Sequence, residues 1–269
     1  MITLTKDRVL PAIFVLLAVV AAAYSVFIIQ TPSSWPGPDA WFRWPLAMIL
    51  VAAVLQVGSA ILILKGVQRY KSRLRTAFAF IAIAMVLVAI ATVQTTVVSG
   101  YALWEMPWVK YGGLSYPYLI SAIILYGGTR SFAQLVDVRG RLTLYRVVLP
   151  VVTIACIIST MLPHAASPLP EPVFDFLSII NLWTALLNLI AGSVLWRVAG
   201  SIGGFYARAI AWLALGITIG GIVTSIVWVS PFFVADLQNP IGIVVNALGA
   251  VAGICMLTAG SLFTKLEKI

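Results

Sequence analysis

The residues of this sequence best able to do chemistry are polar side chains inside otherwise apolar stretches. Five of them recur at steps of three or four between positions 174 and 197: Asp175, Ser178, Asn181, Thr184 and Asn188. That spacing places them along one side of a helix. Hydrocarbon cannot satisfy amide groups, so this side must face other helices or a wet cavity. We therefore expect the other apolar segments to pack around this helix.

Further amides stand in other apolar segments, and together with this helix they form a candidate binding set. The set comprises Gln56, Gln94, Asn181, Thr184, Asn188 and Asn246. Such side chains can simply bond across helices, which contributes about 0.6 kcal/mol each in membranes. Alternatively, they line a pocket for a ligand or quinone together with neighbouring aromatic side chains. Both interpretations remain open at this point.

A second candidate group lies at the expected outer mouth of the helices. Its members are Glu105, His164, Glu171 and Asp175. They could bind a cation or a protonatable ligand, or they could be solvated rim residues.

Other kinds of chemistry find no support in the sequence. His164 is the single histidine, which excludes a bis-histidine haem within this chain. Cys156 and Cys255 both fall inside expected helices without a CxxC motif, so we expect no disulfide, zinc site or other cofactor. The expected spans carry no acid, base or histidine near their centres, which argues against proton relays, ion-coupled transport and intramembrane hydrolysis. We expect a protein that is not an enzyme.

Composition determines the class of fold. Of the 269 residues 62% are hydrophobic and 9% are charged, with a mean hydropathy of +1.07, whereas soluble domains carry about 25% charged residues. We therefore expect an all-α, polytopic membrane protein forming one domain over 1–269. Eight apolar segments are long enough to cross a bilayer: about 9–30, 45–66, 76–100, 114–135, 147–163, 174–197, 205–229 and 240–263.

The distribution of charge gives the expected orientation. With eight spans, fifteen of the seventeen Lys and Arg residues fall on one side of the membrane, together with three acids. Positive residues mark the cytoplasmic side and favour anionic lipid head groups. We expect both termini to be cytoplasmic in a plasma membrane, and we attribute the net charge of +9 to topology rather than to nucleic-acid binding.

An internal repeat is indicated at an offset of 132 positions. Gln56 then pairs with Asn188, and Phe80 pairs with Trp212. The pairing would divide the chain into halves 1–138 and 139–269, a parallel 4+4 duplication about an axis along the membrane normal. Two further patterns, Gly216-xxx-Gly220 and Gly249-xxx-Gly253, predict close helix packing.

Two resemblances to known families can be stated. The last seven spans resemble the topology of a microbial rhodopsin, with Lys110-Tyr111 followed by Pro117, but Ala250 in the final span leaves no lysine for a retinal Schiff base. Residues 54–164 resemble the membrane input regions that precede histidine kinase or diguanylate cyclase domains. The motifs that carry this resemblance are WVKYGG from Trp108, YGGTRSF from Tyr126, Arg139-Gly140-Arg141, Pro150 and His164. It implies a signal passed to a separate partner.

Three functions follow as hypotheses. The first is a non-enzymatic receptor-like or accessory membrane protein that binds a small apolar ligand, lipid or partner helices within the bundle. The second is a cofactor-free anchor or quinone-site subunit of a respiratory complex. The third is a facilitative transporter. Membrane lipids and a cytoplasmic or in-membrane protein are the expected partners, and nucleic acid is not.

Overall fold

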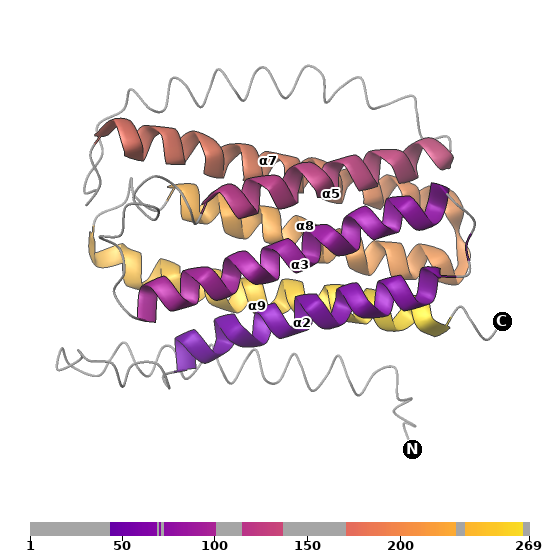
Figure 1. Ribbon diagram of the computed structural model, residues 1–269, viewed down its shortest axis with the longest axis horizontal. Helices are drawn as coiled ribbons and strands as arrows, with labels where there is room; N and C mark the ends of the chain where they lie inside the picture. Colours follow the sequence, from indigo (N-terminus) through magenta and orange to yellow (C-terminus); the bar gives the residue numbers. More distant parts are fainter. Residues whose placement is uncertain are drawn as a thin grey trace.

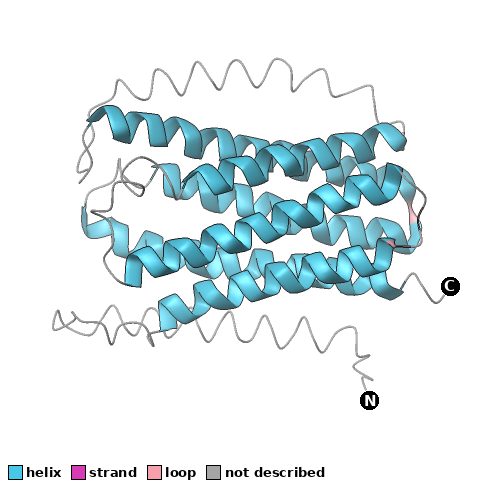
Figure 2. Ribbon diagram, in the orientation of Figure 1, coloured by secondary structure: helices cyan, strands magenta, loops and turns pink. Residues whose placement is uncertain are grey.

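The computed structural model describes the backbone of six segments and most of their side chains. The backbone ranges are 44–68, 70, 73–100, 115–136, 171–229 and 235–265; the side-chain ranges are 51–68, 70, 73–94, 115–136, 180–226, 245 and 247–265. Within these ranges the regular secondary structure is α-helix alone, joined in places by short turns (Figure 2). The helices are α2 (Trp44–Val67), α3 (Arg73–Gly100), α5 (Ser115–Leu135), α7 (Glu171–Ile202), α8 (Gly204–Val229) and α9 (Ala235–Lys265).

Six of the eight expected spans correspond to these helices, and the segments 9–30 and 147–163 lie outside the described residues. The two largest differences from the expected bounds are at the end of α7 and at the start of α9. α7 runs to Ile202 and ends where the chain reverses at Gly203 and Gly204, whose φ angles are 71° and 67°. α9 begins at Ala235, five residues before Pro240, so the proline lies beyond the first turn, where it removes one backbone hydrogen bond and crowds the carbonyl group four residues earlier.

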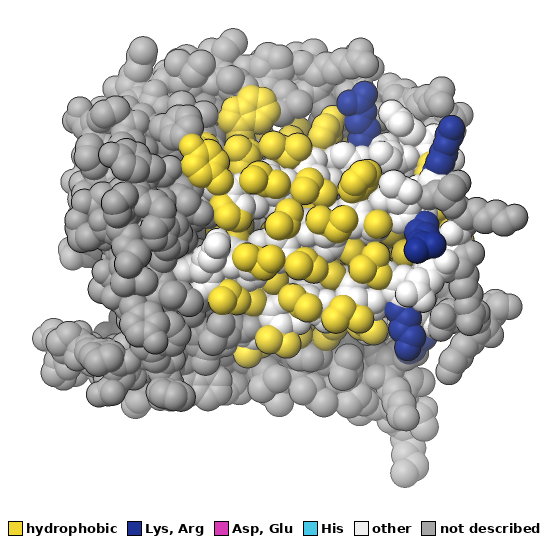
Figure 3. Space-filling view, viewed as in Figure 1, with side chains coloured by type: hydrophobic (Ala, Val, Ile, Leu, Met, Phe, Trp, Pro, Cys, Tyr) yellow, Lys and Arg dark blue, Asp and Glu magenta, His cyan; other side chains and the backbone are white. Residues whose placement is uncertain are grey.

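Four of the helices are long and apolar enough to cross a membrane, over Arg73–Gln94, Ile180–Ile202, Gly204–Ile226 and Ala247–Lys265. α2 contributes a shorter apolar stretch, Val51–Val67. Large apolar side chains also cover the outside of the bundle, as a lipid-facing surface requires (Figure 3). Val54 on α2 is 70% exposed, for example, and Ile123 on α5 is 52% exposed. This arrangement is that of a helical membrane protein.

The six helices form a closed ring. They run along a common direction (Figure 1), and each packs mainly on two others, in the order α2, α3, α5, α7, α8, α9 and back to α2. In consequence α3 lies between α2 and α5 just as α8 lies between α7 and α9.

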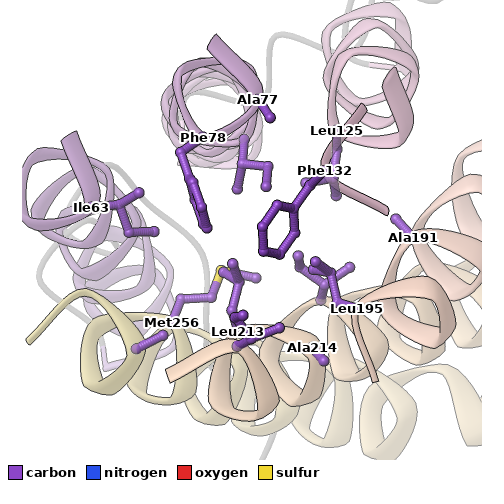
Figure 4. Packing of buried hydrophobic residues seen from close by; sticks show 14 of the residues in the cluster. Ile63, Ala77, Phe78, Leu125, Phe132, Ala191, Leu195, Leu213, Ala214 and Met256 are labelled. Atoms are coloured by element: carbon purple, nitrogen blue, oxygen red, sulfur yellow. The ribbon is translucent and has the colours of Figure 1, made fainter. Parts of the chain in front are cut away.

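One end of the ring is filled by aromatic side chains. The rings of Phe78 and Phe132 lie 5.0 Å apart, and Phe78 and Phe263 lie 4.9 Å apart. Side chains from all six helices, Ile63 and Leu195 among them, converge around these rings (Figure 4). The packed core therefore closes this end of the ring.

The same end carries the positive charge. The Lys and Arg residues whose side chains are described lie at helix ends that meet there, as Figure 3 shows along one edge of the molecule: Lys65, Arg73, Arg75, Arg130, Arg197, Arg208 and Lys265. Glu171 and Asp236 fall in the first turns of α7 and α9, at the opposite end.

Positions 132 residues apart occupy similar environments in the two halves of the ring. Ile63 and Leu195 are both fully buried, as are Ile81 and Leu213. The same holds for Ala77 with Ala209 and for Ala82 with Ala214. Outward-facing positions match as well, since Phe80 is 42% exposed and Trp212 is 37% exposed.

A candidate binding cavity inside the helix ring

The half of the ring away from the basic end contains a partly open cavity of ≈ 470 Å³. All six described helices line it. Most of the wall is apolar, with Met85, Leu125, Ile217 and Met256 at the end nearest the packed core. Polar side chains interrupt this wall: Gln56, Thr92, Ser115, Tyr118, Ser121, Asn181, Asn188 and Thr224. An apolar pocket with a few converging polar groups is typical of small-molecule sites.

Gln56 is the most informative residue of this wall. It lies in the middle of α2 and is only 8% exposed. Its Oε1 is fully buried and has no hydrogen-bond partner among the described residues. Leaving a buried acceptor unsatisfied costs about 1–3 kcal/mol, because the group loses water without gaining a replacement.

The two asparagines of α7 reach the same cavity. Asn181 and Asn188 are separated by seven residues, or two helical turns, and both line the wall. Their side of α7 thus faces the interior of the ring rather than lipid. Thr184 lies between them in sequence but does not line the cavity. It is 1% exposed, and its hydroxyl donates to the Ile180 carbonyl oxygen at 2.9 Å.

Hydroxyl groups on α3 and α5 were missing from the sequence-based set. Ser121 donates to the Ala84 carbonyl oxygen at 3.0 Å, which ties α5 to α3. The hydroxyls of Thr92 and Tyr118 are 3.3 Å apart across the same pair of helices. Ser115, Tyr118 and Ser121 recur at steps of three, the spacing that singled out α7, so the same signal could have found them.

The two remaining residues of the predicted binding set are not among the described residues that line the cavity. Gln94 has a buried Oε1 without a hydrogen-bond partner in the described part of the chain, but it does not line the cavity. Asn246 belongs to α9, as do the lining residues Val245 and Gly249, and its side chain lies outside the described set.

The predicted outer mouth falls largely outside the described residues. Glu105 and His164 are outside them altogether, and only the backbone is described at Glu171 and Asp175, in the first turns of α7. Across the described ranges, no three histidine, cysteine or acidic side chains gather as metal ligands would.

The two glycine motifs divide into packing and cavity positions. A Cβ atom at Gly216 would lie 2.9 Å from the Ala252 carbonyl oxygen, and one at Gly253 would lie 3.1 Å from the Leu55 Cβ. Gly220 and Gly249 instead have no such neighbour within 4 Å among the described residues, and both line the cavity. The described residues therefore show the expected close packing at Gly216 and Gly253 but not at Gly220 and Gly249.

The ring and its cavity define a helical membrane protein with an internal pocket. No protein-family model, curated protein or solved structure matches the chain.

Proposed function

We propose that this protein is a non-enzymatic, receptor-like or accessory membrane protein that binds a small, mostly apolar molecule in the cavity of its helix ring. The observation that carries the proposal is Gln56, a residue of the cavity wall whose buried Oε1 has no hydrogen-bond partner among the described residues. An oxygen acceptor requires a donor, so the ligand presents an N–H or O–H group there. The amides of Asn181 and Asn188 offer both donors and acceptors to its other polar atoms.

The composition of the wall supports a neutral ligand. The described cavity wall contains no acid, lysine, arginine or histidine, and a charged ligand buried without a partner would be strongly disfavoured. Apolar side chains of α3, α5, α8 and α9 would contact the body of the ligand. A membrane-dissolved molecule with one or two polar groups fits this description.

We also propose the topology within which the cavity works. The chain crosses a plasma membrane eight times, with both termini and the basic end of the ring in the cytoplasm. Positive charge at one end of the described helices supports this orientation. The two halves, 1–138 and 139–269, are a parallel repeat. The cyclic helix order and the matched burial at an offset of 132 support that duplication.

Native purification of the whole chain tests the proposed binding. The protein would be extracted in mild detergent and its bound molecules identified by mass spectrometry, beside a Gln56→Met variant. We expect the variant to retain about a tenth or less of the ligand, since a lost hydrogen bond to a buried amide costs on the order of 1–3 kcal/mol.

Gln68→Met is the matched control, because Gln68 is exposed beyond the end of α2 and the substitution is the same. It should retain the ligand of the unmodified protein. A well-folded unmodified protein that carried no small molecule would refute the proposal.

A further inference from the structure

Glycines within the helices of this ring need an explanation, because glycine in a helix interior is conformationally costly relative to alanine. Close backbone approach is the usual reason in membrane helices. It accounts for Gly216 and Gly253, which contact α9 and α2 respectively.

Close approach does not account for Gly220 and Gly249. Both lie well inside α8 and α9, and a Cβ atom on either would meet no described atom within 4 Å outside its own stretch of helix. Both line the cavity. A larger side chain at either position would therefore extend into the cavity without striking the backbone of a neighbour.

The position 132 residues before Gly220 carries a larger side chain, which fills part of the cavity wall. Val88 lies 132 positions before Gly220, and both line the cavity. The wall is thus filled by a β-branched side chain on α3 and left open on α8. Gln56 lines the same cavity, and its buried Oε1 has no hydrogen-bond partner in the described part of the chain, which indicates a polar ligand atom independently of the glycines.

We infer that Gly220 and Gly249 are specificity-determining residues, whose missing side chains make room for the widest apolar part of the ligand between α8 and α9. The ligand class is a neutral molecule with a ring or branched apolar group beside these glycines and an N–H or O–H donor directed at Gln56. This inference rests on the proposed function and adds to it the position and shape of the ligand.

Gly220→Val and Gly249→Val test the inference in the full chain, purified and analysed by mass spectrometry as above. Each variant should fold like the unmodified protein, by size-exclusion profile and thermal unfolding. Each should retain less ligand by about tenfold or more, because overfilling a formed pocket costs on the order of 1–3 kcal/mol. Gly127→Val is the matched control, since Gly127 is exposed on α5 with nothing within 4 Å.

The outcomes separate this inference from the function beneath it. Ligand in the unmodified protein and in Gly127→Val, with strong loss in both cavity variants, supports the inference. Equal ligand in all four proteins overturns the inference and leaves the proposed binding intact. An empty unmodified protein overturns both. Gly220→Val and Gly249→Val chains that failed to fold would contradict the open space on which the inference depends, and would overturn it.

Discussion

At the scale of single residues, the difference between Gln56 and Thr184 separates binding from packing. Both are buried polar residues that the sequence marks equally well. The Thr184 hydroxyl donates to the carbonyl oxygen one turn back, whereas Gln56 lines the cavity and its buried Oε1 has no donor among the described residues. Polar spacing along a helix predicts which side is polar, but it cannot predict which side chains satisfy themselves locally.

Thr184→Val should therefore leave ligand binding unchanged. The substitution keeps the shape of the side chain and removes one local hydrogen bond, so we expect a loss of about 0.5–1.5 kcal/mol in stability. Ligand retention by mass spectrometry and thermal unfolding in detergent measure the two effects. A loss of ligand comparable to that of Gln56→Met would mean that Thr184 belongs to the site.

At the scale of the helices, the pairs are held by close approach of backbones at small residues. A Cβ atom at Gly128 of α5 would lie 2.9 Å from the Ala77 carbonyl oxygen of α3. A Cβ atom at Gly260 of α9, 132 positions after Gly128, would lie 2.9 Å from the Leu62 Cβ of α2. The two glycines thus pack against different helices: Gly128 contacts α3 and Gly260 contacts α2.

Gly127 and Gly128 allow this packing to be tested at adjacent positions of one helix. Gly128→Ala should destabilise the protein by about 1–3 kcal/mol, because the added methyl group collides with α3. Gly127→Ala should be neutral or stabilise by up to about 1 kcal/mol, because it gains helix propensity in open space. Thermal unfolding in one detergent gives both values. Equal effects at the two positions would show that the close approach to Ala77 is not what holds α3 and α5 together.

Most of the helices could be predicted because the signal that defines them is local. A run of apolar residues between turn residues and charges marks the body of a membrane helix. The ends are harder to predict: Gly200 continues α7, whereas Gly203 and Gly204 end it with positive φ, and the residue type is the same at all three positions. Whether a glycine packs against a neighbouring helix or borders a cavity depends on what that helix places opposite it. Sequence spacing alone cannot predict this.

At the scale of the whole molecule, the ring has one hollow half and one packed half. Phe78, Phe132 and Phe263 fill the basic end, so the cavity does not continue through the described part of the ring. This arrangement favours binding over an open path across the membrane.

Composition and charge could predict the membrane class and the basic end. The position of the cavity could not be predicted, because it depends on which side chains of six helices converge.

The positive charge at one end of the ring predicts that this end faces the cytoplasm. In a background with Cys156 and Cys255 replaced by serine, Gln68→Cys reports on the basic end, and Ser167→Cys reports on the segment expected outside. A membrane-impermeant maleimide added to intact cells should label Ser167→Cys and spare Gln68→Cys, because positively charged helix ends are retained in the cytoplasm. Inverted vesicles should reverse the pattern and serve as the accessibility control. Labelling of Gln68→Cys in intact cells would place the basic end outside. The cavity half of the ring would then face the cytoplasm, and both termini would lie on the opposite side from the one we propose.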